Sequence, residues 1–579
     1  MSDLPLEPKR DEVAGAFRAF RRAFAILAMV SFVINLLMLT GPMFMLQVYD
    51  RVLASGSIPT LVGLIGLVVI LYGFFGILDA LRNRILSRIG QNIDERLSGG
   101  AFHATVLLSV RAARFSGRVE PLADLERIRQ FLASPGPAAI YDVPWLPFYL
   151  FVVFLLHPVL GLLGLAGAAL LSALILVNER ASRQPVADLG RLTGLRNTFI
   201  EGVRDNGEAI FAMGMFGDMY RFWQKRNDAF LEVQRDVSDR AGFYGSLIRT
   251  IRFLMQSLVL GAGAWLAVRG AITPGVIVAG SIITSRALAP IEQAVAQWRN
   301  FLAARQGLAR LKKVLELTAE AEPTLRLPPP TERIIVDNAA IAPPGAQMPL
   351  IQGTSFTLKA GDGLGIIGPS GSGKSTLARG LIGVWPAVRG SIRLDGSEFG
   401  HWSRIDLGRS IGYLPQDVEL FDGTVADNIA RFDREASADA VIAAARIADV
   451  HDLVARLPEG YNTRIGMGGM MLSAGQRQRI GLARALYGNP FLVVLDEPNA
   501  HLDAEGEQAL TEAIRATRAR GAIVIVIAHR PNALAAVDQV MFVKDGRQGA
   551  FGPKDEVLAA VTKNRRPPGL AVVESGGRP

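Results

Sequence analysis

The chain has 579 residues, half of them hydrophobic, with a formal net charge of +9 and a mean hydropathy of +0.28. This length exceeds what one hydrophobic core supports, and the hydropathy is high for a soluble enzyme but low for a chain of membrane spans alone. The composition therefore predicts one membrane half and one soluble half, and the absence of cysteine excludes disulfides, zinc–thiolate sites and thiol catalysis.

Apolar stretches dominate the first three hundred residues. Residues 1–22 are polar and basic, and the stretch that follows them is too long for the apolar region of a cleaved signal peptide. Six stretches, each long enough with some tilt for a hydrocarbon core of roughly 30 Å, cover about residues 23–46, 60–80, 138–156, 159–177, 253–268 and 274–290. We therefore expect a cytoplasmic segment at 1–22 and a six-helix transmembrane domain at 23–316.

The charge of the connections sets the orientation of these spans. Those after the second and fourth stretches are long, arginine-rich loops, whereas the other three are short and carry only Arg51 and Arg269. The positive-inside rule then places the N-terminus, both long loops and the soluble half in the cytoplasm. The charge also suits nucleic acid, but no binding motif for it accompanies the charge, so the membrane surface is favoured.

Polar residues at the fifth stretch have two interpretations. Arg249, Arg252 and Gln256 either line a polar path through the membrane domain or lie at the interface with their charges directed to water.

The second half of the chain changes character. Proline and charge mark residues 317–333 as a linker. Residues 334–562 alternate apolar strand-like runs with helical stretches, which predicts an α/β domain with a parallel sheet. Residues 563–579 read as a disordered tail.

A glycine-rich loop opens this α/β domain. Residues 368–375, GPSGSGKS, fit the phosphate-binding pattern G-x-x-x-x-G-K-[ST] between a strand and a helix. Backbone N–H groups wrap the phosphates, Lys374 neutralises their oxygens, and Ser375 ligates Mg²⁺. The expected nucleotide-binding residues of the loop are Gly368, Ser370, Gly371, Ser372, Gly373, Lys374, Ser375 and Thr376.

Acidic and polar residues follow later strand-like runs. Asp496 ends the run FLVVLD, where its carboxylate can hold Mg²⁺, and the adjacent Glu497 can polarise an attacking water as general base. His529 ends another apolar run, from which it can reach a γ-phosphate. Gln416 lies in a loop between the phosphate-binding loop and the later motifs. Alone, each of these residues would be an ordinary polar group; downstream of the glycine loop they become candidates.

A second anion-binding pattern stands at LSAGQ, residues 472–476. A serine and small residues precede a basic helix, which is how a helix N-terminus receives an anion. Together these motifs resemble the nucleotide-binding domain of an ABC transporter, with Walker A and Walker B motifs, a Q-loop at Gln416, a signature at 472–476, a D-loop containing Asp503 and a switch histidine at His529.

The resemblance implies an assembly. In this family the signature and D-loop of one domain close over the nucleotide held by the Walker A loop of another, which implies a homodimer with two composite ATP sites. ATP and Mg²⁺ are the implied cofactors, with the ATP-contacting residues of this second group being Ser473, Ala474, Gly475, Gln476 and Asp503. The implied catalytic residues are Glu497, His529, Gln416 and Lys374, and the metal ligands are Ser375, Gln416 and Asp496.

Three positions depart from the family pattern. Ala474 stands where glycine is usual; if it loosens closure, Ala474→Gly raises ATP turnover. The aromatic residue that usually stacks on adenine is not evident in residues 339–349, where Pro343 or a neighbour is the substitute. Residues 464–471 lack the acidic residue that many exporters carry there.

Further stretches narrow the class of exporter. The sequences GPMFMLQVYDRVL, YDVPWLPFYL and GYLPQDVELFDGTVADNIARF resemble type I secretion ABC proteins of the protease-secretion (PrtD-like) branch. That resemblance implies an inner-membrane pump working with a periplasmic adaptor and an outer-membrane channel on an unfolded polypeptide with a C-terminal signal. The short N-terminal segment leaves no room for a peptidase domain, and short docking helices are expected near 117–127 and 201–213.

Two alternatives remain. The first is a lipid or small-molecule exporter with the same engine. The second is a non-hydrolysing ABC channel or regulatory scaffold, against which the presence of Lys374, Glu497 and His529 argues.

Overall fold

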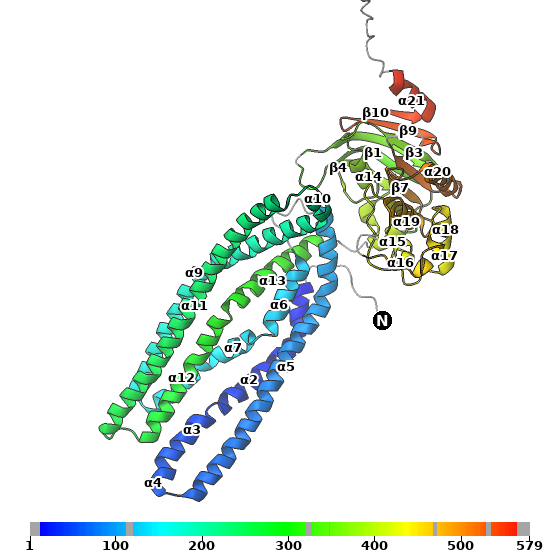
Figure 1. Cartoon of the computed structure of the whole chain (residues 1–579). Helices are drawn as coiled ribbons and strands as arrows, with labels where there is room; N and C mark the ends of the chain where they lie inside the picture. Colours follow the sequence, from blue (N-terminus) through cyan, green and yellow to red (C-terminus); the bar gives the residue numbers. More distant parts are fainter. Residues whose placement is uncertain are drawn as a thin grey trace, which may run out of the picture. The chain divides into compact units, whose positions relative to one another are not determined.

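The computed structural model describes residues 12–111, 120–319, 327–346, 348–466, 472–528 and 534–563. Contacts divide the chain into a helical unit, residues 1–109 and 117–320, and an α/β unit, residues 321–579, with which residues 110–116 are grouped. Figure 1 shows both. The expected domain limits stay predictions: α13 ends at Thr318 and β1 begins at Arg333. Residues 564–579 of the expected tail lie outside the described residues.

The helical unit contains the expected membrane spans. Within the described residues, six helical segments are long and apolar enough to cross a membrane, which confirms the six stretches: Arg21–Ser55, Ile58–Val110, Gly136–Leu156, Pro158–Asp205, Phe216–Val268 and Pro274–Ala296. Its elements are α1 (Glu12–Ala19), α2 (Arg21–Leu37), α3 (Thr40–Gln47), η1 (Val48–Val52), α4 (Leu53–Ser55), α5 (Ile58–Arg111), α6 (Pro121–Leu132), α7 (Gly136–Asp142), η3 (Val143–Trp145), α8 (Leu146–Leu156), α9 (Pro158–Asp205), α10 (Gly207–Ala212), α11 (Phe216–Val268), α12 (Pro274–Ala296) and α13 (Trp298–Thr318).

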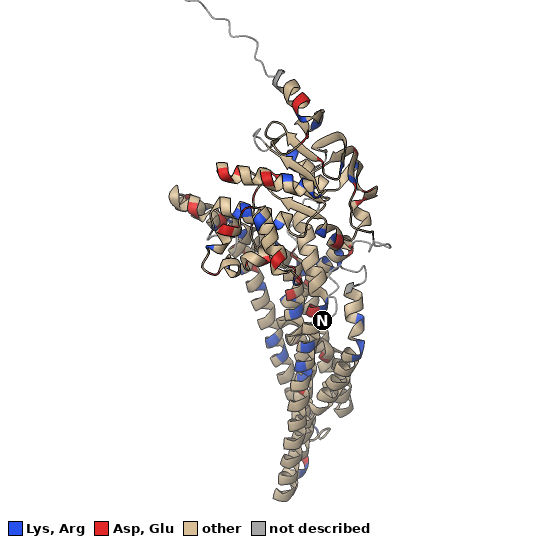
Figure 2. Cartoon of the chain, turned by 90° about the vertical axis from the view of Figure 1, so that its right-hand side faces the viewer, with Lys and Arg blue, Asp and Glu red and all other residues tan. Residues whose placement is uncertain are grey.

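Within the described residues, the two long connections are mostly helix, well beyond the short helices that the sequence suggested. α5, α9 and α11 each continue far beyond their apolar part. Polar residues there support the helix, as in the Asp79–Arg82 and Asp236–Arg240 pairs one turn apart. The apolar residues end where the helix would leave the membrane, but the helix itself continues as a hydrogen-bonded structure. In Figure 2 the lower half of the helical unit is nearly all tan apart from a few charges near its lower end, and the blue residues lie above.

Two short helices stand near the expected docking segments. α6 covers most of the first, whose residues 117–119 lie outside the described residues, and α10 lies within the second. Whether they dock on the α/β unit stays a prediction.

The α/β unit is built on a sheet which, among the described residues, has ten strands in the order β5-β4-β1-β2-β10-β9-β3-β8-β7-β6. The strands are β1 (Arg333–Ile341), β2 (Ile351–Lys359), β3 (Gly363–Ile367), β4 (Ala387–Leu394), β5 (Ser397–Glu398), β6 (Ile411–Leu414), β7 (Leu492–Asp496), β8 (Ile523–Ile527), β9 (Gln539–Lys544) and β10 (Arg547–Pro553). The helices are α14 (Lys374–Leu381), η4 (Phe399–His401), α15 (Arg404–Arg409), α16 (Val425–Ile429), α17 (Ala438–Ile447), α18 (His451–Ala455), η5 (Gly460–Asn462), α19 (Ala474–Leu486), α20 (Ala504–Ala519) and α21 (Lys554–Lys563).

The expected parallel sheet is only part of this one. β9, β3, β8, β7 and β6 pair in parallel, whereas β1 pairs antiparallel with both β2 and β4. All residues of β7 and β8 are buried, as parallel strands covered on both faces require. β2 alternates buried and exposed residues, which suits an antiparallel strand with one solvated face.

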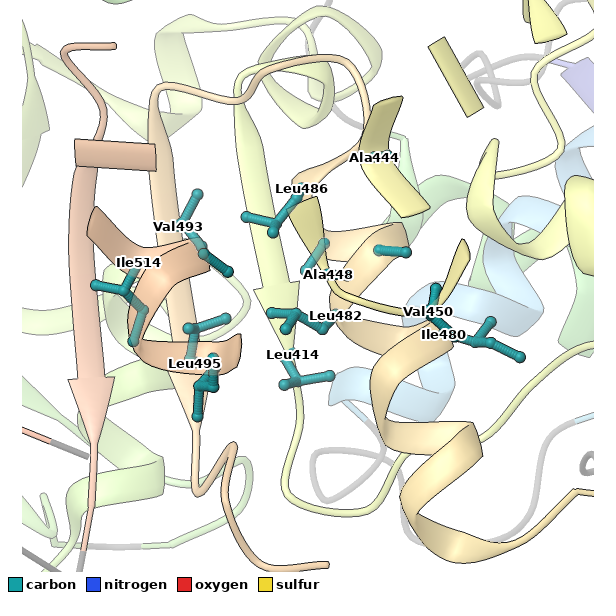
Figure 3. Close-up of a cluster of buried hydrophobic side chains, with 14 of the residues drawn as sticks. Leu414, Ala444, Ala448, Val450, Ile480, Leu482, Leu486, Val493, Leu495 and Ile514 are labelled. Atoms are coloured by element: carbon teal, nitrogen blue, oxygen red, sulfur yellow. The ribbon is translucent and has the colours of Figure 1, made fainter. Parts of the chain in front are cut away.

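Two hydrophobic clusters place helices on opposite faces of the central strands. Ile480 and Leu486 of α19 share one cluster with Val493 of β7 (Figure 3). Leu377 of α14 shares the other cluster with Val494. Because successive residues of β7 face opposite sides, one strand anchors the helix after each anion-binding loop.

Candidate functional site

The glycine loop wraps tightly between β3 and α14. Gly368 has φ 159° and Gly373 has φ 96°. A Cβ at Gly368 would lie 2.0 Å from the Val543 carbonyl oxygen, and one at Gly373 would lie 2.7 Å from Ile351 Cδ1. Both positions therefore require glycine, and the chain passes from the strand into the N-terminus of α14, where free N–H groups favour phosphate.

Lys374 is held inside this loop. Its Nζ donates to the carbonyl oxygens of Gly368, at 3.1 Å, and Pro369, at 2.8 Å. Burial lowers the pKa of the Lys374 ammonium, which the carboxylates of Glu497 and Asp496 oppose. The positive charge thus stands at the centre of the phosphate-binding loop.

Asp496 is positioned by the neighbouring strands. β8 pairs in parallel with both β3 and β7, so the glycine loop and Asp496 leave the same edge of the sheet. The Asp496 side chain is 1% exposed and hydrogen-bonds Ser375. Burial raises the pKa of the Asp496 carboxyl, while the Ser375 hydrogen bond and the nearby Arg379 and Lys374 act in the opposite direction.

The carboxylate of Asp496 and the hydroxyl of Ser375 fit a magnesium ion. Asp496 Oδ1 is buried and, among the described residues, has no hydrogen-bond partner. A buried carboxylate oxygen without a donor is costly unless a cation or water approaches it. Carboxylate and hydroxyl oxygens are the ligands that Mg²⁺ takes beside a nucleotide, so Asp496 and Ser375 fit the ion that the sequence implied.

Glu497, directly after β7, has a strained backbone conformation that a hydrogen bond holds in place. Its φ is 51°, in the left-handed region, and its N–H donates to the Ile527 carbonyl of β8 at 3.0 Å. Gln416, which follows β6, places Nε2 3.4 Å from Glu497 Oε2. The structure therefore brings the proposed base and the Q-loop glutamine together. His529 lies outside the described residues.

The signature motif forms a capped helix N-terminus. Ser473 Oγ accepts from the Gln476 N–H at 3.2 Å, and Gln476 Oε1 accepts from the Ser473 N–H at 2.9 Å. Ala474 is the first residue of α19 and is not among the residues with positive φ, so its methyl group fits. Gly475 is tighter: a Cβ there would lie 2.9 Å from the His501 carbonyl oxygen.

Gln478 is a residue that sequence reasoning missed. It is 2% exposed, and its Nε2 donates to the carbonyl oxygens of Pro498, at 2.7 Å, and Glu497, at 3.2 Å. Its Oε1 lies 3.0 Å from His501 Nδ1. Gln478 stands four residues before the buried Leu482 and therefore on the same, inward face of α19. This spacing is the only sequence signal that distinguishes the buried Gln478 from Gln476.

The D-loop is fixed to the same helix. Asp503 Oδ1 accepts from the Gly506 N–H at 2.9 Å, capping α20, and from Arg479 Nη2 at 3.1 Å. The backbone hydrogen bond to Gly506 and the charge of Arg479 lower the pKa of Asp503. Among the described residues, no hydrogen bond joins residues 473–476 to the glycine loop at 368–376, so the two anion-binding motifs are separately supported.

Two apolar residues, Ile351 and Leu350, lie beside the glycine loop. Ile351 packs against Gly373, and Leu350 Cγ lies 3.7 Å from the Cβ position at Gly373. Leu350 is 44% exposed. Pro343, the substitute that the sequence suggested, is half-buried in the turn between β1 and β2.

The two arginines near the fifth span, Arg249 and Arg252, are paired with an acidic residue of the sixth. Arg249 Nε lies 3.2 Å and Arg252 Nε 2.7 Å from the carboxylate of Glu292 on α12, and Arg252 also donates to Ser285. This pairing joins α11 to α12.

Comparison with known proteins gives matches over both halves of the chain. The ABC transporter transmembrane region matches residues 24–288, and the ABC transporter family matches residues 351–500. The type I secretion system ATP-binding protein PrsD of Rhizobium meliloti (strain 1021) is 49% identical over 566 residues, 97% of either chain.

More distant relatives extend the comparison. The cyclolysin secretion/processing ATP-binding protein CyaB of Bordetella pertussis is 28% identical over 557 residues, which are 95% of this chain and 77% of CyaB. A solved structure of a bacterial Atm1-family ABC exporter with ATP bound superimposes with a TM-score of 0.78, over 95% of this chain and 99% of that one. At 23% identity this second likeness concerns the fold.

Proposed function

The chain belongs to the ABC transporter family and is a multi-pass membrane ATPase, and from this premise we propose that it energises a type I secretion system by exporting an unfolded polypeptide across the inner membrane. The observation that carries the proposal is the 49% identity to a type I secretion ATP-binding protein over nearly the whole of both chains. CyaB, whose name also describes secretion, supports the same assignment.

We propose that two copies form the working unit. Residues 473–476 have no hydrogen bond, among the described residues, to the glycine loop of their own chain, which leaves the capped N-terminus of α19 available for a nucleotide held elsewhere. A homodimer supplies that nucleotide twice, at two composite sites. Closure around ATP and its loss on hydrolysis would then drive transport.

In each site the residues divide the work. Lys374 and the N–H groups of the glycine loop bind and orient the phosphates, and Ser375 with Asp496 holds the ion. The bound Mg²⁺ supplies charge neutralisation at the phosphates. Glu497 orients and deprotonates the attacking water, with Gln416 beside it; His529 is proposed to contact the γ-phosphate.

The partners follow from the same proposal. A periplasmic adaptor protein and an outer-membrane channel would continue the path of the polypeptide, whose C-terminal signal selects it. The chain itself would remain in the inner membrane, with its α/β unit in the cytoplasm.

The proposal is tested with Glu497→Gln, compared with Glu512→Gln at an exposed position of α20. In the full-length protein we expect Glu497→Gln to accumulate ATP-bound dimers with little turnover, and Glu512→Gln to behave as the unchanged protein. Unchanged ATP hydrolysis in Glu497→Gln would show that the base is misassigned.

Cargo is tested separately. Co-expression with a cognate adaptor and channel should give ATP-dependent appearance of a polypeptide in the medium. Lipid flipping by the dimer alone, without dependence on any polypeptide, would contradict polypeptide export.

A further inference from the structure

A groove lies at the junction of α1 and α2 with the middle of α5. It encloses about 320 Å³. Its apolar lining includes Phe20, Leu81 and Ile85, and its polar lining includes Arg84, Arg88 and Asn92. The Arg96 guanidinium lies 5.2 Å from the centroid of the Phe20 ring and so fixes one wall. The groove thus combines an apolar wall with a basic rim.

The two arginines of the rim have no acidic partner among the residues that the structure describes. Arg84 and Arg88 are one helical turn apart, so their like charges lie on one face of α5 and repel. Both are exposed, and among the described residues neither has an ion-pair or hydrogen-bond partner for its guanidinium. Arg82, two residues earlier, is instead buried and pairs with Asp79 and Asp142. The charges of Arg84 and Arg88 are therefore open to an external anion, whereas the charge of Arg82 is already paired.

The groove is at the depth of lipid headgroups. From Ile58 to Leu78, α5 has no charged residue over about 30 Å at roughly 1.5 Å per residue, the thickness of a hydrocarbon core. Arg84 then follows about 9 Å and Arg88 about 15 Å beyond the end of this stretch. On the other wall, Arg21 and Arg22 immediately precede the apolar run of α2. Both helices therefore leave the hydrocarbon at the groove.

We propose that this groove binds an anionic phospholipid of the cytoplasmic leaflet. The phosphodiester lies between Arg84 and Arg88, and the start of an acyl chain lies against Phe20, Leu81 and Ile85. The volume is at the lower end for small-molecule sites, enough for a headgroup and the nearest part of a chain. Anionic lipids are abundant in that leaflet, and basic pockets between membrane helices are where their headgroups bind.

The test uses the full-length protein in nanodiscs, with phosphatidylglycerol titrated into phosphatidylcholine and bound lipid counted by native mass spectrometry. Arg84→Gln/Arg88→Gln should weaken phosphatidylglycerol binding about 25-fold, the loss expected for two arginines at an anionic surface. The matched control is Arg180→Gln/Arg183→Gln, exposed residues of α9 that also follow an apolar stretch but lie outside the groove. This control should retain the binding.

Three further measurements separate the alternatives. Arg84→Lys/Arg88→Lys should restore most of the binding, and ATPase activity in phosphatidylcholine alone should equal that of the unchanged protein, which shows that the variants fold. Displacement of the lipid by inorganic phosphate at equal concentration would assign the site to free phosphate and overturn the proposal. Equal losses in the α9 control, or no loss in Arg84→Gln/Arg88→Gln, would overturn it too.

Discussion

Arg82 on α5 donates from Nη1 to both carboxylate oxygens of Asp142 on α7, at 3.1 and 3.2 Å, inside the helical unit. Asn35 on α2 donates to the same carboxylate at 2.8 Å, and the Tyr149 hydroxyl on α8 bonds Asn35. All four residues are at least nine-tenths buried. One ionic network therefore joins the first three membrane spans.

Removing the acid from this network should destabilise the protein strongly. Asp142→Ala leaves the buried Arg82 guanidinium with only Asp79, and losing one partner of a buried ion pair costs about 3–5 kcal/mol. The thermal unfolding temperature of the full-length protein in detergent should fall accordingly. The control Asp218→Ala removes an exposed pair with Arg221 and should have little effect.

A second variant checks that the effect belongs to the pair. Arg82→Gln/Asp142→Asn removes both charges and should be less destabilised than the sum of the single variants. Additive losses would show that the two side chains act independently.

Asp496 should lower the stability of the α/β unit when Mg²⁺ is absent. Burial raises its pKa above the ordinary 3.8, so the folded protein keeps this proton to a higher pH than the unfolded chain does. Its unfavourable contribution is absent below pH 3.8, grows as the pH rises through the interval up to the raised pKa, and is complete above it.

Asp496→Asn should therefore unfold at a higher temperature than the unchanged protein at neutral pH in a chelator, and the difference should shrink on acidification. Adding Mg²⁺ and ATP should stabilise the unchanged protein more than the variant, which keeps the glycine loop but loses one ligand of the ion. Asp337→Asn, at an exposed position of β1, is the control. A variant less stable than the unchanged protein in chelator would contradict the argument.

The two small residues of the signature should differ in tolerance. Ala474→Gly should change ATP turnover less than about twofold, because the alanine already has ordinary helical backbone. Gly475→Ala should reduce turnover about tenfold or more, since its methyl group would push on the His501 carbonyl oxygen of the D-loop. Steady-state ATPase assays decide, and a marked increase in Ala474→Gly would show that the alanine does loosen closure.

Leu350 should contribute to ATP affinity in place of an aromatic residue. Leu350→Ala should raise KM for ATP about three- to tenfold with little change in kcat, because it removes half-exposed apolar surface beside the glycine loop. Leu350→Tyr should lower KM again. Ile405→Ala, which changes an exposed residue of α15, serves as the control. An unchanged KM in Leu350→Ala would show that the adenine ring of ATP does not contact Leu350.

The elements that the sequence predicts well are those with a local signal. Hydropathy identifies the six spans, and the glycines of the loop before Lys374 have a spacing that only phosphate binding demands. The long helical extensions were missed because charge ends the hydropathy signal without breaking the helix, as along α5.

Contacts between distant residues leave no such signal. Arg82 and Asp142 are 60 residues apart, and neither looks unusual beside its neighbours. Gln478 likewise stands in a motif already explained by its other residues. The antiparallel pairing of β1 with β4 was missed because β2, β3 and α14 separate the two strands in the sequence, so the pairing shows only in three dimensions.

The amide of Gln478 also links residues that would serve two different ATP sites in a dimer. It holds the backbone of Glu497, which serves the nucleotide on its own chain, to the helix whose N-terminus would face the nucleotide of the other. In a dimer, a shift of that helix when one ATP is lost would therefore reach the base at the other ATP directly.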